Sequence, residues 1–184
     1  MKIPLPTLAN VRMLGIAAVA GGIVHICTTF VAQYHASDAI YERLSRTFAA
    51  NTMHVIAPIT PDIRILAFFG ADTSVAICRF DASGGPIRVE AILSGAGWSL
   101  VVYARDGGGI DAVSGQDDKQ TDIKLLLKPP GDRFFQGPTS EALGLQVVPL
   151  PTPEGMVVLR APLKGAAYKR SIETDLKRAR CQPT

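Results

Sequence analysis

One run of apolar positions stands out near the start of the chain. Residues 13 to 32 (MLGIAAVAGGIVHICTTFVA) contain no Asp, Glu, Lys or Arg. A helix of about 20 apolar residues is long enough to cross the hydrocarbon core of a bilayer. Lys2 and Arg12 precede the run, and the first charged residue after it is Asp38. The positive-inside bias therefore predicts a single-pass protein with a cytoplasmic N-terminus and an exported remainder.

A cleaved signal peptide is the alternative interpretation of this run. Its apolar length exceeds the roughly 7–15 residues of a signal-peptide core, and the stretch from Thr29 to Ala32 matches a small-residue cleavage site poorly. Both features favour an uncleaved membrane anchor over residues 1–34, which would contact membrane lipid through one helix. In a bacterium with two membranes, this places the protein in the inner membrane with its main domain in the periplasm.

Small residues recur four apart within the predicted span, as Ala17 with Gly21 and Ala18 with Gly22, and His25 lies one turn beyond Gly21. Small side chains let two membrane helices approach closely. The face formed by Ala18, Gly21, Gly22 and His25 is therefore a candidate contact for a membrane-protein partner. The alternative is that Ala and Gly are simply common in membrane spans. An ionisable His25 in the span suggests a helix contact or a cofactor ligand, but with no second ligand nearby we favour a neutral imidazole.

The pattern after the span predicts a short helix and then a run of strands. Ser37 can cap a linker helix over residues 35–50 whose apolar stripe is Ile40, Leu44 and Phe48. From residue 51 the period changes to two, most clearly in Ile87–Leu93, which alternates apolar and charged side chains. The predicted strands are 53–56, 74–81, 87–93, 98–103, 110–113, 121–127, 145–150 and 155–161.

The last part of the chain predicts a helix with one apolar face, formed by Tyr168, Ile172, Leu176 and Ala179. Many short strands followed by one helix indicate a β-rich α+β fold, an antiparallel sandwich or jelly-roll-like domain over residues 51–184. Within it, alternation places Trp98, Leu100 and Val102 together in the core. The 17 glycines and 13 prolines fit a domain with many turns.

Charge and motif content exclude several classes of function. The net charge of +3 is too small and too dispersed to predict a nucleic-acid partner. The three histidines, His25, His35 and His54, show no metal-ligand spacing, and the acidic run from Asp106 to Asp118 lacks the spacing of a calcium loop. No nucleophile elbow is present. The sequence therefore predicts no catalytic, cofactor or metal site.

The three cysteines divide by compartment. Cys27 lies inside the predicted span, whereas Cys78 and Cys181 lie in the exported part, where disulfides form and persist. The sequence favours a bond between Cys78 and Cys181, and two free, buried thiols are the alternative. In the chain-entropy model, a bond that closes a loop of about 100 residues contributes at most about 4–5 kcal/mol. It would attach the C-terminal helix to a core strand.

Several blocks of the chain together resemble one family. They are Val75–Asp81, which contains Cys-Arg-Phe-Asp, then Gly85–Val89, Trp98–Tyr103, the span segment Gly22–Ile26 (GIVHI) and the basic ending Ala179–Cys181. The chain resembles the bacterial membrane-associated domain-of-unknown-function family numbered 1254, in its short form with one N-terminal anchor. The resemblance implies a β-rich envelope domain, supports the anchor and the cysteine pair, and suggests a protein of the companion family numbered 1214 as a partner. It departs at Asp111–Gly115, where members tend to have a tyrosine-serine-asparagine stretch, which puts any shared binding role of that hairpin in doubt.

Two functions follow as hypotheses. The first is a non-catalytic, membrane-anchored envelope component that binds a protein partner or a small ligand. The second is an envelope enzyme that acts on a glycan or lipid through dispersed residues such as Arg79 and Asp81. The basic C-terminal helix could also touch anionic lipid, but cations near a helix C-terminus, such as Lys177 and Arg178, are equally what the helix dipole favours.

Overall fold

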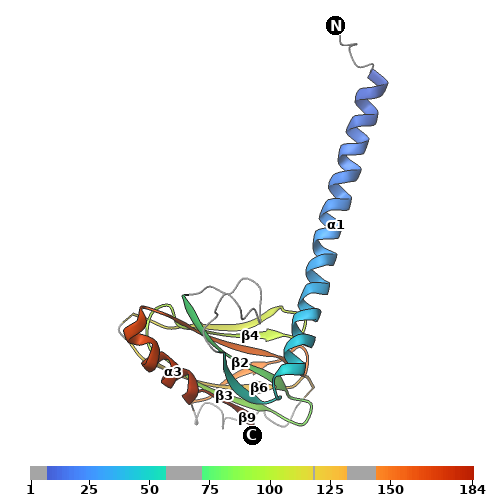
Figure 1. The fold of residues 1–184 in the computed structure, drawn as a ribbon. Coiled ribbons are helices and arrows are strands. Elements are labelled where there is room, and N and C mark those ends of the chain that lie inside the picture. Colours follow the sequence, from blue (N-terminus) through green and yellow to red (C-terminus); the bar gives the residue numbers. More distant parts are fainter. Residues whose placement is uncertain (1–7, 57–71, 118, 132–143) are drawn as a thin grey trace. The chain divides into compact units, whose positions relative to one another are not determined.

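The structure is a computed structural model that describes residues 8–56, 72–117, 119–131 and 144–184. The chain divides into two compact units, residues 1–37 and residues 38–184. The first unit is helical and the second contains the sheets (Figure 1).

One long helix, α1 (Leu8–Thr47), accounts for both helices that the sequence predicts near its start. The prediction of a separate linker helix over residues 35–50 is wrong. Ser37 lies inside α1 and does not precede a new helix. The physical reason is local: the segment between Gln33 and Asp38 holds neither Gly nor Pro, so nothing interrupts the helix. The chain leaves α1 after Thr47 and turns at Asn51, which has a positive φ of 57°.

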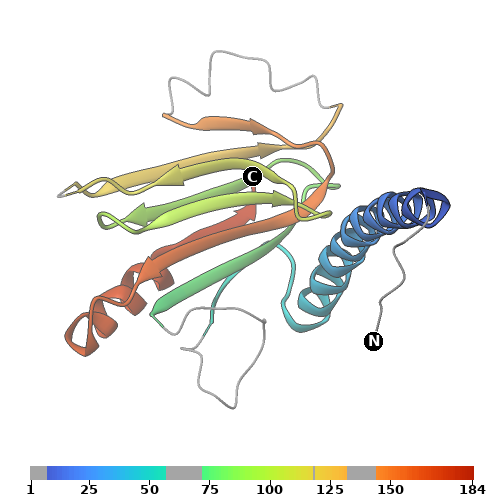
Figure 2. The ribbon, with the colours of Figure 1, turned by 90° about the horizontal axis from the view of Figure 1, so that it is seen from above.

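In the part of the chain that the structure describes, nine strands form two sheets, seen as two layers in Figures 1 and 2. The five-stranded sheet has the order β1-β2-β8-β4-β5, and the four-stranded sheet has the order β7-β6-β3-β9. The strands are β1 (Thr52–Ile56), β2 (Thr73–Asp81), β3 (Ile87–Leu93), β4 (Ser99–Ala104), β5 (Gly109–Ser114), β6 (Thr121–Lys128), β7 (Gln146–Pro149), β8 (Glu154–Pro162) and β9 (Arg180–Pro183). All pairs are antiparallel except β6 with β7, which is parallel.

The core lies between the two sheets and follows the period of two. In β3, Ile87, Val89, Ala91 and Leu93 are buried, and the residues between them are half-buried on the outer face. One apolar cluster contains residues from both sheets together with Ile172 and Leu176 of the C-terminal helix α3 (Lys169–Arg178). This arrangement confirms the predicted β-rich α+β class with two packed sheets.

Gly155 in β8 is a position where the packing admits no side chain. A Cβ placed there would lie 2.5 Å from Cζ of Phe80, which is itself fully buried. The strand pairing sets Gly155 directly beside Phe80. The aromatic ring therefore occupies the space above the glycine, as is common where a backbone is closely approached within a sheet.

Three details of the second unit differ from the sequence prediction. The chain adds a strand, β9, where only the end of a helix is predicted, and β7 pairs in parallel with β6. Tyr168 belongs to a short 3-10 helix, η1 (Ala166–Tyr168), and is 55% exposed, so it does not share the buried face of α3. Ala179, in contrast, is buried as predicted.

The structure confirms that Trp98, Leu100 and Val102 are buried together in the main core. Trp98→Ala should lower the free energy of unfolding by about 3–5 kcal/mol, because a large apolar side chain is removed and a cavity remains. Val101→Ala is the matched control, since Val101 is half-buried on the opposite face of β4, and it should cost clearly less. Urea unfolding of the purified protein, followed by far-ultraviolet circular dichroism, measures both. An unchanged unfolding midpoint for Trp98→Ala would contradict the burial.

Candidate functional site

The apolar half of α1 is the first candidate for a functional surface. Residues Val11–Ala32 have a mean hydropathy of 1.9 and are long and apolar enough to cross a membrane. The large apolar side chains of this segment are all more than half exposed. Such a helix near an N-terminus fits an anchor or a signal helix by length and composition.

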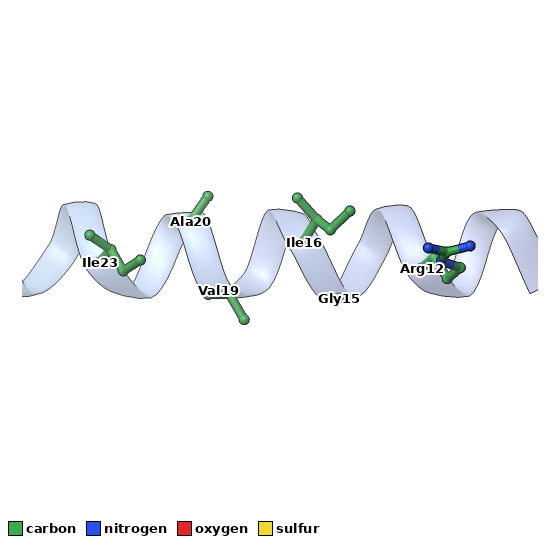
Figure 3. Close-up of a pocket in the computed structure, with 6 residues that line it drawn as sticks. All are labelled: Arg12, Gly15, Ile16, Val19, Ala20 and Ile23. Atoms are coloured by element: carbon green, nitrogen blue, oxygen red, sulfur yellow. The ribbon is translucent and has the colours of Figure 1, made fainter.

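Two opposite sides of this helix differ in the size of their side chains. Figure 3 shows one side of the helix, which carries Arg12, Gly15, Ile16, Val19, Ala20 and Ile23. At 100° per residue, Ala18, Gly21 and His25 of the predicted partner face lie on the other side, and Gly22 lies at the edge between the two sides. That face comprises Ala18, Gly21, Gly22 and His25. A Cβ added at either glycine would meet no atom within 4 Å, so the backbone is open to close approach there.

Two threonine hydroxyl groups near the C-terminal end of the apolar segment form hydrogen bonds within the helix. Thr28 Oγ1 and Thr29 Oγ1 both donate hydrogen bonds to the carbonyl oxygen of His25, at 2.9 and 2.8 Å. Threonines commonly bond back to the preceding turn in this way. Because the bonds lie within the helix, neither hydroxyl needs a water molecule or a partner when the segment lies in lipid.

The disulfide between Cys78 and Cys181 is confirmed and links the two sheets. Cys78 lies in β2 of the five-stranded sheet and Cys181 in β9 of the four-stranded sheet, with their Cα atoms 6.4 Å apart. Both cysteines are buried, and the bond closes a sequence separation of 103 residues. It therefore attaches a strand to a strand, rather than a helix end to a strand. Cys27 in α1 is free and exposed.

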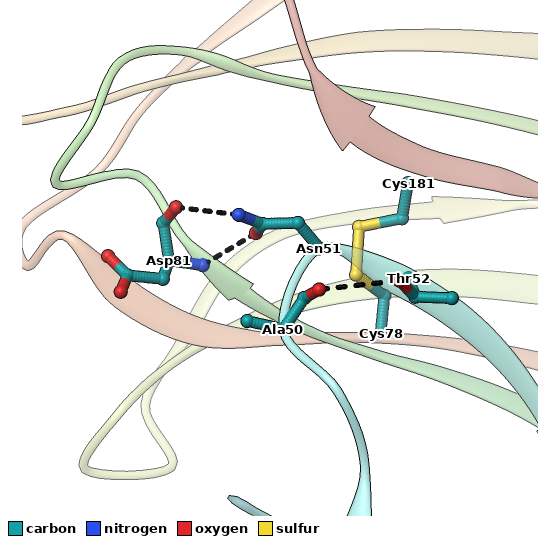
Figure 4. Close-up of a disulfide and its surroundings, with 6 residues drawn as sticks. All are labelled: Ala50, Asn51, Thr52, Cys78, Asp81 and Cys181. Carbon is teal, nitrogen blue, oxygen red and sulfur yellow. Dashed lines mark hydrogen bonds between the residues drawn. A yellow bond between two sulfur atoms is a disulfide. The ribbon is translucent and has the colours of Figure 1, made fainter.

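The entry to β1 is held close to the disulfide by Asn51, as Figure 4 shows. Its backbone N–H donates to the carbonyl of Arg79 at 2.8 Å. Its side chain donates to the carbonyl of Asp81 at 3.1 Å and accepts from the Asp81 N–H at 2.8 Å. Asparagine is also one of the few residues with a side chain that tolerates a positive φ. Asn51 thus forms hydrogen bonds with backbone groups at the end of β2 and also turns the chain into β1.

The outer face of the five-stranded sheet carries a second, smaller apolar cluster. It comprises Ile56, Val75, Ile77 and Val158, with Phe48 and Tyr103 packed against it. Phe48 follows the end of α1, and its ring lies 4.9 Å from the ring of His54 in β1. Leu44 and Phe48 of the predicted stripe therefore pack on the sheet domain, where Leu44 is buried. The side chain of Ile40, the third residue of that stripe, lies outside the described part of the structure.

Arg105 joins the last turns of α1 to the sheet. Its guanidinium donates to Glu42 at 3.1 Å and to Glu154 at 2.6 Å, and its Cζ lies 5.1 Å from the centre of the Tyr41 ring. Glu154, and to a lesser degree Glu42, raises the pKa of Arg105, which stays charged. Burial raises the pKa of the Tyr41 hydroxyl, although the nearby Arg79 opposes that shift, so Tyr41 stays neutral at physiological pH.

Arg79 and Asp81, the residues of the enzyme hypothesis, lie on the same face of β2 but serve different neighbours. The Asp81 carboxylate accepts a hydrogen bond from the Ser83 N–H at 2.9 Å, and this bond is the main cause that lowers its pKa. Arg79 is half-buried beside Tyr41. Across the described ranges, no three His, Cys, Asp or Glu side chains gather as metal ligands would. Asp81 is thus a turn residue in this fold.

Comparison with known proteins supports the fold alone. No protein-family model matches the chain, and no curated protein matches it. Among solved structures, the chain is similar to the VPA0106 protein from Vibrio parahaemolyticus, with a TM-score of 0.58 and 12% sequence identity. The likeness covers 83% of this chain but 36% of that protein, so the chain spans about a third of its length. At this identity the shared property is the arrangement of the strands and helices.

Sequence reasoning found the disulfide, but it missed the contacts of Arg105 and Asn51. The small-residue face stays a prediction. Tyr41 lies three residues before Leu44 and seven before Phe48, so helical spacing could have added it to the stripe. Nothing local indicates that Arg105, more than sixty residues away from Glu42, would pair with it. The turn role of Asn51 is readable only once its positive φ is known.

Replacing Cys181 by Ser should loosen the C-terminal strand while the remaining sheets stay folded. Cys181→Ser removes a cross-link whose loss from a small exported domain typically costs about 2–5 kcal/mol. Limited proteolysis should then cleave near β9 and α3 first, and thermal unfolding should begin at a lower temperature. Cys27→Ser is the matched control, because Cys27 is unpaired, and it should change neither result. Equal protease resistance in both variants would contradict the structural role of the bond.

Proposed function

We propose that the protein is a non-catalytic component of a bacterial cell envelope, held in the inner membrane by an uncleaved α1. The observation that carries this proposal is the combination of one membrane-length helix, preceded by Lys2 and Arg12, with a disulfide that joins the two sheets. Disulfides persist in exported compartments. The positive-inside bias then keeps the N-terminus in the cytoplasm and brings residues 38–184 to the periplasm.

The partner in this proposal is a membrane protein that packs against Ala18, Gly21, Gly22 and His25. Close approach of two backbones is a main source of attraction between helices in lipid, and this side of α1 offers it. The resemblance to the family numbered 1254 suggests a protein of the companion family numbered 1214 as that partner. The sheet domain would then be the part of the complex that faces the periplasm.

The topology follows from charge and can be tested with reporters. Alkaline phosphatase fused after Thr184 should be active in cells, whereas a cytoplasm-active reporter at the same position should not. Lys2→Ser with Arg12→Ser should reduce phosphatase activity, because the orienting charges are removed. Mass measurement of the mature chain should show the anchor still present. A new N-terminus near Gln33, or activity of the cytoplasmic reporter alone, would contradict the proposal.

The helix contact can be tested by photo-crosslinking in membranes. A photoreactive residue at position 18 or 22 should give one discrete adduct. The matched position 16, which lies about 120–160° around the helix from both, should give none. Gly22→Ile should abolish the adduct formed from position 18, because a branched side chain keeps the partner backbone away. Adducts of equal yield from both sides, or none from either, would contradict a specific helix contact.

A further inference from the structure

The N-terminal end of the C-terminal helix carries a group of exposed residues that folding does not explain. Lys164, Tyr168, Lys169 and Arg170 are all exposed, and the alanines of η1 between them are exposed as well. Within the described ranges outside α1, Tyr168 is the one large apolar side chain that is exposed. We call these four residues the 164–170 patch.

Helix energetics argue against a purely structural role for these cations. Lys169 and Arg170 occupy the first turn of α3, which contains no acidic residue. The positive end of the helix dipole lies there, so cations in this turn are mildly destabilising. The opposite holds for Lys177 and Arg178, which lie in the last turn and are stabilised by the dipole. The helix dipole therefore explains the cations in the last turn of α3 but not those in the first turn.

The described salt bridges do not account for the patch either. Of the charged residues of α3, Arg178 pairs with Asp175, at 3.5 Å, and Asp175 also accepts a hydrogen bond from Ser94. No pair in the described ranges involves Lys164, Lys169 or Arg170. Three cations without an ion pair among the described residues thus flank one exposed aromatic ring within seven residues.

We infer that the 164–170 patch docks on the anionic headgroups of the bilayer that holds α1, an inference that rests on the proposed anchoring. Lysine and arginine near an anionic membrane surface attract it, and an amphipathic tyrosine ring is suited to the headgroup region. The anchor keeps the domain at high effective concentration near that surface, so a weak contact is enough. Docking would fix how the sheet domain is presented above the membrane.

Hydrogen exchange of the full chain in lipid nanodiscs tests this inference. One set of discs contains phosphatidylcholine alone and the other an equal mixture with phosphatidylglycerol. Each cation near an anionic surface contributes about a fivefold gain in partitioning. Peptides that cover residues 164–171 should therefore exchange at least about fivefold more slowly in the anionic discs.

Two variants with the same change of charge separate this site from general electrostatics. Lys169→Gln with Arg170→Gln should abolish the lipid dependence. Lys177→Gln in the last turn of α3 together with Arg180→Gln in β9 should retain it. All four side chains are exposed, so neither variant disturbs the core. The helix dipole should raise the unfolding temperature slightly in the first variant and lower it slightly in the second. Tyr168→Ser should weaken the effect in the same direction as loss of the cations.

The outcome also separates docking from anchoring. Slow exchange of residues 13–30 in both kinds of disc reports that α1 lies in the bilayer. If those residues are protected and the 164–170 patch exchanges equally in both discs, the docking is contradicted and the anchor stands. If residues 13–30 are not protected, the proposed anchoring itself fails. Binding of the patch to a soluble acidic protein without any lipid dependence would contradict the lipid assignment.

Discussion

The bond between Cys78 and Cys181 constrains both how this chain folds and where it can do so. It joins the second strand of the five-stranded sheet to an edge strand of the four-stranded sheet, across the core that both sheets bury. β9 has four residues and, among the described strands, pairs with β3 alone, so few backbone hydrogen bonds hold it. The cross-link thus fastens one of the two four-residue edge strands of its sheet, and it is consistent with a domain that lies outside the cytoplasm.

A second set of contacts within residues 38–184 attaches the end of α1 and the start of β1 to the five-stranded sheet. Arg105 bridges Glu42 and Glu154, and Asn51 bonds the end of β2. The ion pairs are exposed, so each contributes little to stability by itself. Together with the buried Leu44 and the packing of Phe48 on the sheet, these ion pairs fix the position of the last turns of α1 on the sheet. The last turns of α1 therefore belong to the folded domain.

Local pattern predicted most of the fold, and non-local pairing accounts for what it missed. The alternation in Ile87–Leu93 and the spacing of Ile172 and Leu176 are properties of neighbouring residues, and both gave the right elements. β9 is too short for an alternating pattern to be recognised. It forms by pairing with β3, which lies some ninety residues earlier in the chain. The disulfide was predictable because Cys27 lies in the predicted span, which leaves two cysteines, Cys78 and Cys181, in the part predicted to be exported. Ser37 has the chemistry of a helix cap, but its neighbours are all able to continue the helix.

The central claim is that the sheet domain folds in an oxidising compartment with Cys78 and Cys181 joined. It is tested most directly by trapping the thiols of the full chain in living cells with acid, then labelling them with a polymer-linked maleimide under denaturing conditions. The account predicts that one thiol, that of Cys27, reacts before reduction and that all three react after it. Three reactive thiols without reduction would contradict the cross-link and, with it, the export of the domain.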